Sequence, residues 1–195
     1  LSPKSNGPCI GLVQDGITGL YCLTHLDTFL DKATAMQIFT LIDADGEFPE
    51  PAILKPKMLW TGKQLFSTII PKNVIFERNF DSDSNEETGV FKSDDSFCCI
   101  KKGQLLRGRV DKAMVGASSN SLLHHIVFYR GGPAAVQFLT MAQRLADQFL
   151  QHHGFSIGLS DVMVPEKTHK EADRVLDAAK KIAVFWTLQK KPERM

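Results

Sequence analysis

The 195-residue sequence is 43% hydrophobic and 23% charged, which is ordinary for a soluble globular protein with a real core. Its 23 Lys and Arg residues nearly balance 22 Asp and Glu residues, so the net charge of +1 excludes a strong overall field for nucleic acid. One domain, or one with an appendage, is expected at this length.

The four cysteines, Cys9, Cys22, Cys98 and Cys99, show neither the number nor the spacing of a disulfide framework. No Cys-x-x-Cys occurs, so we expect reduced intracellular thiols rather than zinc or redox chemistry. The sequence has no signal-like start and no run of about 18 apolar residues, so we expect neither secretion nor a membrane span. The start Leu-Ser-Pro-Lys suggests a segment cut from a longer protein.

The first elements are short. The apolar run 9–13 lies between turn signals and predicts a buried strand that ends at Gln14-Asp15-Gly16. Residues 17–23 predict a second strand or an irregular crossing. A helix is expected over 27–41 from apolar residues at helical spacing, with Thr24 or Asp27 as its cap.

The next region contains two turns and a proline-rich run. Asp43-Ala-Asp-Gly46 matches neither a complete calcium loop nor a catalytic aspartate motif, and predicts an ordinary turn. In the run 51–64, prolines enforce extended geometry, Trp60 supplies an apolar anchor, and Thr61 can cap a short helix over 62–69. The run therefore predicts an extended segment that leads into a helix.

A hairpin is predicted in the middle of the sequence. Residues 74–80 favour a strand, and the polar stretch 81–88 is expected to be a solvated mobile loop. Residues 97–100 and 104–110 flank Lys101-Lys102-Gly103, which is typical of a β-hairpin with glycine in its turn.

The second half is predicted to be helical. A helix over 122–129 should end at a glycine pair, and Pro133 should open another that ends near residue 153. Residues 155–159 are expected to be extended. The last helix, from 165 to about 188, carries a narrow apolar stripe among many charges, which suggests a partner helix. The fold class expected is α+β, with short strands and helices followed by a long C-terminal helix.

Few residues suggest independent chemistry. Adjacent histidines at 124/125 and 152/153 do not converge on one ion in a helix, and the serines near 118 lack a nucleophile elbow. No phosphate-binding glycine loop occurs, so we expect no catalytic residue and no metal or cofactor site in this chain. A hydrolase is a distant alternative.

Two polar groups remain as candidates. Gln14 and Asp15 lie at the predicted end of a strand, where functional residues are common, although a turn with a cap explains them as well. Cations cluster along the predicted hairpin and form either a solvated face or a phosphate-attracting one: Lys101, Lys102, Arg107, Arg109 and Lys112.

The run 51–64 resembles the segment Pro-Ala-Ile-(Leu/Ile)-Lys-Pro-x-x-Leu-Trp-(Thr/Ser)-Gly-Lys-Gln of the largest subunit of multisubunit DNA-directed RNA polymerases. Four other segments resemble the same subunit in the same order. They are Ser-Pro-Lys-Ser-Asn-Gly-Pro with Gly-Leu-Val-Gln-Asp (2–15), Thr-His-Leu-Asp-Thr-Phe (24–29), Gly-Arg-Val-Asp-Lys with Val-Gly-Ala-Ser-Ser (108–119), and Gly-Phe-Ser-Ile-Gly-Leu-Ser-Asp (154–161). The last departs from the family pattern at Leu159 and Ser160.

The resemblance implies a pore domain over 1–163 and the start of a funnel helical hairpin over 164–195. In that family the pore lines a secondary channel for nucleotide entry and for extrusion of a backtracked RNA 3′ end. It implies that Gln14, Asp15 and Lys112 face the channel side, and that the helix bearing Glu166, Lys167 and Lys170 is where a transcript cleavage factor docks. Further implied partners are other polymerase subunits, nucleoside triphosphates and, through the parent enzyme, template DNA.

The parent enzyme is a nucleotidyltransferase that uses Mg²⁺, but the motif Asn-Ala-Asp-Phe-Asp-Gly-Asp that binds it is missing here, so this segment alone should be inactive. The resemblance implies a nuclear location, or a cytoplasmic one if the source is viral. Some motifs resemble the nuclear messenger-RNA polymerase and others the small-RNA polymerase. The alternative function is a non-catalytic interaction module derived from the pore domain.

Overall fold

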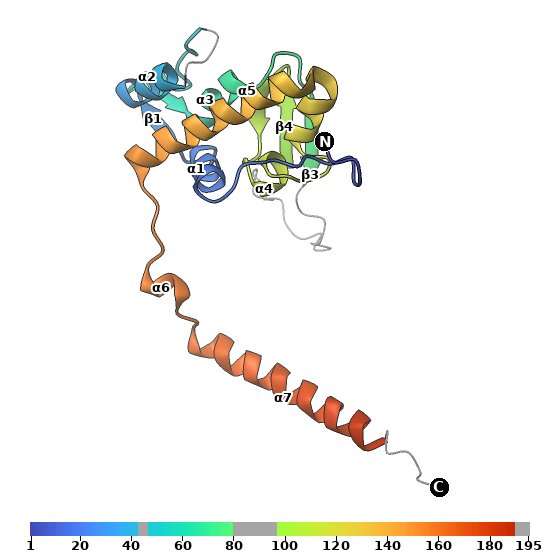
Figure 1. Ribbon diagram of the computed structural model, residues 1–195. Coiled ribbons are helices and arrows are strands. Elements are labelled where there is room, and N and C mark those ends of the chain that lie inside the picture. Colours follow the sequence, from blue (N-terminus) through green and yellow to red (C-terminus); the bar gives the residue numbers. More distant parts are fainter. Residues whose placement is uncertain (43–46, 80–96, 190–195) are drawn as a thin grey trace. The chain divides into compact units, whose positions relative to one another are not determined.

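The N-terminal segment leads into a helix that the sequence did not indicate. The computed structural model describes residues 1–42, 47–79 and 97–189, and in it α1 spans Asp15–Leu23 (Figure 1). The predictions of a strand at 9–13 and of a strand or irregular crossing at 17–23 are wrong. Residues 9–13 form no strand, and Leu12 is held instead by a single backbone bond from its N–H to the Val115 carbonyl, 3.0 Å long.

Two strand-to-helix units follow. β1 (Phe29–Asp31) leads directly into α2 (Lys32–Leu41), and β2 (Leu59–Thr61) leads into α3 (Gly62–Ile69). The strands pair antiparallel. Each strand supplies the cap of its helix from its last residue, because Asp31 accepts from the Thr34 N–H at 3.1 Å and Thr61 accepts from the Gln64 N–H at 3.3 Å.

The predicted helix over 27–41 therefore begins too early. Its first residues pair as β1 with β2, and Asp31, rather than Thr24 or Asp27, caps the helix. The prediction for 51–64 is confirmed at its C-terminal end, where Thr61 caps α3 and Gln64 completes a capping box. The turn predicted at 43–46 and the loop predicted at 81–88 lie outside the described residues.

A three-stranded antiparallel sheet has the order β3 (Phe76–Asn79), β4 (Phe97–Lys101) and β5 (Gln104–Arg107). The predicted hairpin is confirmed, with Lys102 and Gly103 both at positive φ in its turn, but its second strand ends at Arg107 rather than at residue 110. Helix α3 covers the edge of β5, where the Leu105 N–H donates to Ser67 Oγ at 2.9 Å.

The helical half is organised by α5. A short helix, α4 (Lys112–Val115), precedes α5 (Leu122–His153), which breaks at Gly131, where φ is 82° and ψ is 176°. The two predicted helices on either side of this glycine are confirmed, with Ser121 capping the first. Helix α5 contacts each of α1, α2, α3 and α4, and so forms the spine of this part of the molecule (Figure 1).

The core lies between α5 and the other elements. A continuous cluster of buried apolar side chains includes residues from almost every element, the largest fully buried ones being Phe66, Phe138, Phe149, Leu20, Leu23, Ile38, Ile42, Leu65, Ile100, Met114, Leu122 and Leu123. Apart from α5, the elements of this unit are too short to be stable alone, so their stability comes from this shared core.

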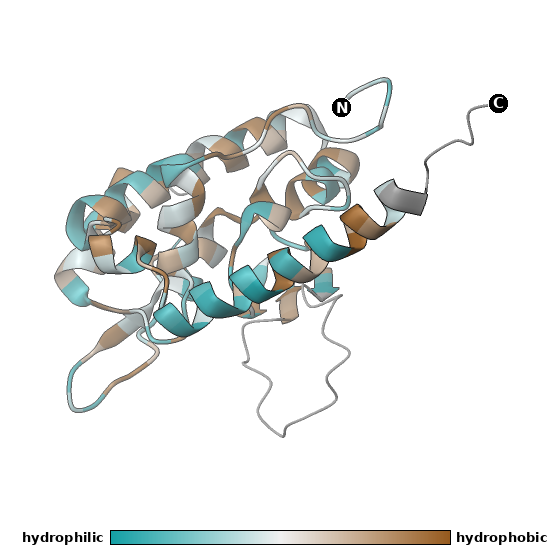
Figure 2. Ribbon diagram, turned by 90° about the horizontal axis from the view of Figure 1, so that it is seen from below, coloured by the Kyte–Doolittle hydropathy of each residue, from teal (hydrophilic) through white to brown (hydrophobic). Residues whose placement is uncertain are grey.

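The chain divides into two compact units, Leu1–Gly154 and Phe155–Met195. The second unit contains α6 (Leu159–Val162) and α7 (Glu166–Gln189). The last predicted helix is therefore confirmed. The extended segment predicted at 155–159 is one residue too long, because α6 begins at Leu159. Figure 2 shows polar and apolar residues along the helix that leads to the C-terminus. The α+β class is confirmed, and the boundary at 163/164 stays a prediction.

Candidate functional site

The start of α1 presents an amide and a carboxylate to solvent. Gln14 is the N-cap residue but makes no side-chain cap bond, and its backbone has φ 48° and ψ −121°. This conformation is costly for a residue with a Cβ, and such strain is concentrated at functional positions. Its carbonyl accepts from the Thr18 N–H at 3.0 Å and from Thr18 Oγ1 at 3.2 Å. The Gln14 and Asp15 side chains are both exposed.

Lys112 is the first residue of α4 and is also exposed. The preceding residue, Asp111, caps the helix by accepting from the Met114 N–H at 3.0 Å. The helix ends when the Gly116 N–H donates to the Lys112 carbonyl at 2.9 Å. Lys112 therefore lies on a single helical turn whose two ends are both fixed by hydrogen bonds.

The structure brings these two segments together. The Leu12 N–H donates to the Val115 carbonyl at 3.0 Å, and a Cβ added at Gly11 would overlap the Gly116 and Ala117 backbone. The irregular segment before Gln14 thus lies directly against the end of α4. These backbone contacts join the segment that bears Gln14 and Asp15 to the segment that bears Lys112.

A buried hydroxyl makes a second link between the same regions. Thr24 Oγ1 donates to the Leu20 carbonyl at 2.8 Å and accepts from the Val110 N–H at 2.9 Å. It joins the C-terminus of α1 to the segment that enters α4. The sequence suggested Thr24 only as a helix cap, because nothing in the sequence indicates which distant N–H it meets.

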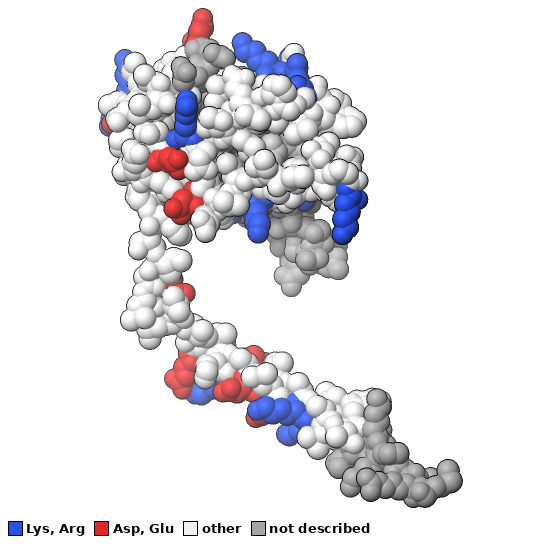
Figure 3. All heavy atoms as spheres, in the orientation of Figure 1, with Lys and Arg blue, Asp and Glu red and all other residues white. Residues whose placement is uncertain are grey.

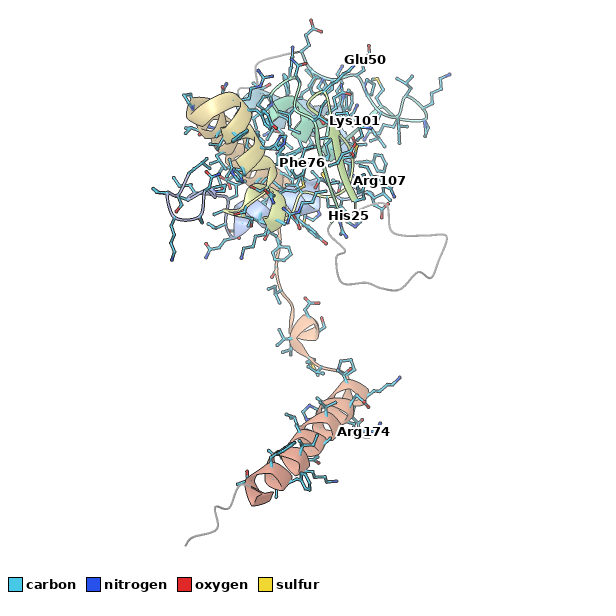
Figure 4. The ribbon with its side chains drawn as sticks, turned by 90° about the vertical axis from the view of Figure 1, so that its right-hand side faces the viewer. His25, Glu50, Phe76, Lys101, Arg107 and Arg174 are labelled. Carbon is cyan, nitrogen blue, oxygen red and sulfur yellow. The ribbon has the colours of Figure 1, made fainter. Side chains whose placement is uncertain are left out.

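The hairpin cations do not gather at one place. Lys101 forms an ion pair with Glu77 at 3.4 Å, and Lys102 occupies the turn. Figure 4 shows Lys101 and Arg107 toward opposite ends of the hairpin, and Figure 3 shows basic side chains as separate patches on the face in view.

The two arginines lie against aromatic rings. The Arg107 guanidinium lies 5.9 Å from the Phe97 ring centroid, and that of Arg109 lies 4.6 Å from the Tyr21 ring centroid on α1. Such cation–π contacts stabilise the packing of long side chains on the surface. A phosphate-attracting role for Lys101, Lys102, Arg107 and Arg109 stays a prediction.

An open groove of about 1320 Å³ lies on another part of the first unit. It is lined by α3, by the β4–β5 turn and by residues near 25–29 and 47–50, and it includes Lys63, Lys72 and Lys102. Gln14, Asp15 and Lys112 do not line it. The sequence did not indicate this groove, because it forms only when segments from four regions assemble.

The start of α7 carries the residues predicted to dock a partner. Glu166 Oε1 and Lys170 Nζ are 2.6 Å apart, with their side chains 82% and 74% exposed. Lys167 is also exposed. The pair is an ordinary solvent-exposed helical ion pair that contributes little stability.

The remaining candidate ligands have structural explanations. Cys98 is buried, and burial raises the pKa of its thiol to about 12, which keeps it protonated and unreactive. His124 Nδ1 accepts from the Asn120 N–H at 3.1 Å.

Within 1–42, 47–79 and 97–189, no three His, Cys, Asp or Glu residues are grouped to hold a metal ion. In the same ranges, no helix is long and apolar enough to cross a bilayer.

Comparison with known proteins identifies the family. The model of the family described as RNA polymerase Rpb1, domain 3, matches residues 1–162. Two DNA-directed RNA polymerase II subunits of Trypanosoma brucei brucei, RPB1-A and RPB1-B, are each 39% identical to this chain over 176 residues, or 90% of its length. The chain belongs to the RNA polymerase Rpb1 domain 3 family, and the predicted resemblance to the largest polymerase subunit is confirmed. It spans about 10% of the length of these relatives.

Proposed function

We propose that this chain forms part of the wall of the secondary channel of a DNA-directed RNA polymerase. Nucleotides would enter by this channel, and a backtracked RNA 3′ end would leave by it. Beside membership of this family, the observation that carries the proposal is the 3.0 Å hydrogen bond from the Leu12 N–H to the Val115 carbonyl. This bond ties the segment that bears Gln14 and Asp15 to the helix that bears Lys112.

Each of the three side chains has a role suited to its chemistry. The Gln14 amide can both donate and accept, which suits a ribose or base edge. The Asp15 carboxylate orients neighbouring basic groups. The Lys112 ammonium attracts the triphosphate of an incoming nucleotide or the phosphates of extruded RNA. None of them takes part in a bond-making step, so we assign no catalytic residue to this chain.

The parent enzyme would supply the chemistry of nucleotidyl transfer. We assign Mg²⁺ to carboxylates elsewhere in the parent subunit, because the aspartate motif of the family that binds it does not occur in this sequence, and we expect the chain alone to be inactive. Template DNA and other subunits would be met only within the assembled polymerase. A transcript cleavage factor would dock at the start of α7, where Glu166, Lys167 and Lys170 are exposed. Membership of such a polymerase would place the chain in the nucleus, or in the cytoplasm if the source is viral.

Replacing Lys112 tests the channel role. In polymerase assembled with the full-length subunit, Lys112→Ala should raise the apparent KM for nucleotides about fivefold at low salt, because one charge near a phosphate contributes roughly 1 kcal/mol. Salt screens such a charge, so the effect should shrink as ionic strength rises. Lys112→Arg should retain most of the activity.

Lys32→Ala provides the control, since Lys32 is an exposed lysine at the start of α2. It should leave nucleotide use unchanged. Elongation and transcript cleavage that stay the same in Lys112→Ala across nucleotide and salt titrations would rule out the channel role of this residue.

A further inference from the structure

One arginine holds both ends of the segment that carries Lys112. Arg78 lies on β3 and is partly buried. Its Nη1 donates to the carbonyl of Ala113 at 3.1 Å and to the carbonyl of Asn120 at 3.2 Å. Ala113 belongs to α4, and Asn120 directly precedes Ser121, the N-cap of α5. A single side chain from the sheet therefore connects α4 to the start of α5.

The two carbonyls are ones that regular structure leaves without a partner. A helix as short as α4 cannot satisfy its own last carbonyls, and Asn120, with φ 56°, lies in a left-handed turn. A guanidinium suits the position because it stays charged at all relevant pH values and offers several N–H groups in one plane. Hydrogen bonds from a charged donor are also stronger than neutral ones.

We infer that Arg78 is the positioning residue for Lys112. It ties α4 to the sheet, while the Leu12 bond ties the end of α4 to the segment before Gln14, and together these bonds restrict where the Lys112 ammonium can reach. This inference rests on the proposed channel function of Lys112. It assigns Arg78 no contact with nucleotide or RNA.

Amide hydrogen exchange tests the anchoring independently of activity. In polymerase assembled with the full-length subunit, Arg78→Met should speed exchange of the amides in 112–121 about tenfold or more, because local opening becomes easier. Arg78→Lys should restore part of the protection, since an ammonium also has several donors.

Arg130→Met is the matched control. Arg130 is an exposed arginine that also bonds a loop carbonyl, from its Nη2 to the Lys72 oxygen at 2.6 Å. Its loss should loosen the residues near Lys72 and leave 112–121 unchanged. Equal exchange in 112–121 for wild type and Arg78→Met overturns the inference.

A double-mutant cycle tests the link to Lys112. Arg78→Met should raise the apparent KM for nucleotides about threefold in the wild-type background, and should cause no further rise in a Lys112→Ala background. The same rise in both backgrounds overturns the positioning role, because Arg78 would then act without Lys112. If Lys112→Ala leaves KM unchanged while 112–121 loses protection in Arg78→Met, the channel function fails and the anchoring stands.

Discussion

Thr24 illustrates how one buried polar atom can determine a local arrangement. The residue is fully buried, at 0% exposure, and its hydroxyl acts both as donor, to Leu20, and as acceptor, from Val110. A buried N–H without a partner is costly, so the Val110 amide requires an oxygen at this place. Only a small hydroxyl side chain supplies both a donor and an acceptor within that space.

His125 should make stability depend on pH. Its ring packs against Phe76 and Tyr129, with centroid separations of 6.0 and 4.5 Å. Burial, and secondarily the charge of His124, lowers its pKa below the ordinary value of 6.5. The unfolded chain then binds more protons than the folded chain just below that value. The contribution of His125 to the unfolding free energy should therefore be fully present above pH 6.5. It should decrease as the pH falls from 6.5 through the lower pKa of the folded state.

The measurement is denaturant unfolding from about pH 7.5 down to about pH 5. His125→Phe retains an aromatic ring and removes the titrating group, so its unfolding free energy should fall less over this range than that of the wild type. Identical pH slopes for the two proteins would contradict the assignment.

At the scale of elements, α1 shows where sequence patterns mislead. Gly16, Ile17, Thr18 and Gly19 are poor helix formers, and they made 17–23 look like a strand or an irregular segment. The helix forms because the glycines allow close contact with α5: a Cβ at Gly19 would lie 2.9 Å from the Ala146 Cβ. Packing that depends on a residue far along the chain outweighs local propensity, and no local pattern reveals it.

The correct predictions rest on local chemistry. The predicted Thr61 cap and the predicted glycine-containing hairpin turn both act on residues close to them in the sequence. Such local effects can therefore be predicted from the sequence. The same reasoning failed at Phe29, because its role as a β1 residue depends on pairing with Thr61.

Gly62 tests the contact between α1 and α3. A Cβ at this position would overlap the carbonyl oxygen of Leu23, so Gly62→Ala must force α3 away from the end of α1. We expect the unfolding free energy to fall by about 1 to 3 kcal/mol, as in other overpacked sites. Denaturant unfolding at neutral pH measures the change.

Gly132→Ala is the control, because a Cβ there meets no atom within 4 Å. It should change the unfolding free energy by less than about 1 kcal/mol. A loss in Gly62→Ala no larger than that in Gly132→Ala would show that the close approach at Leu23 is easily relieved.

On the scale of the whole molecule, the two tryptophans report separately on the two compact units. Trp60 is 3% exposed and Trp186 is 60% exposed. Trp60 is held in the first unit by a bond from its Nε1 to the Pro49 carbonyl at 2.7 Å. The units can therefore be followed by fluorescence in one sample.

We expect Trp186→Phe to leave a blue-shifted emission that acrylamide quenches poorly, because the remaining indole is buried. Trp60→Phe should leave a red-shifted, readily quenched emission that changes little when the first unit unfolds. Equal quenching of the two variants would contradict the difference in burial.

The candidate site was predictable only in part. Gln14, Asp15 and Lys112 could be singled out from local motifs, and the family resemblance suggested that they belong together. The groups that join their segments, namely the Thr24 hydroxyl, the Arg78 guanidinium and the Leu12 amide, act on partners far away in the sequence. Spacing along the chain carries no information about such partners, so only the folded arrangement reveals them.

The bond between Thr24 and Val110 has a consequence for how the chain is made. Its two residues are 86 positions apart, and Arg78 reaches a carbonyl 42 positions further along. Loops of this length close slowly relative to helices and turns. During synthesis, residues up to Val115 must leave the ribosome before Leu12 can bond Val115, and residues up to Asn120 must leave it before Arg78 can bond both of its carbonyls. Because α1 packs against α5 (Leu122–His153), these segments reach their final arrangement only after most of the first unit has been synthesised.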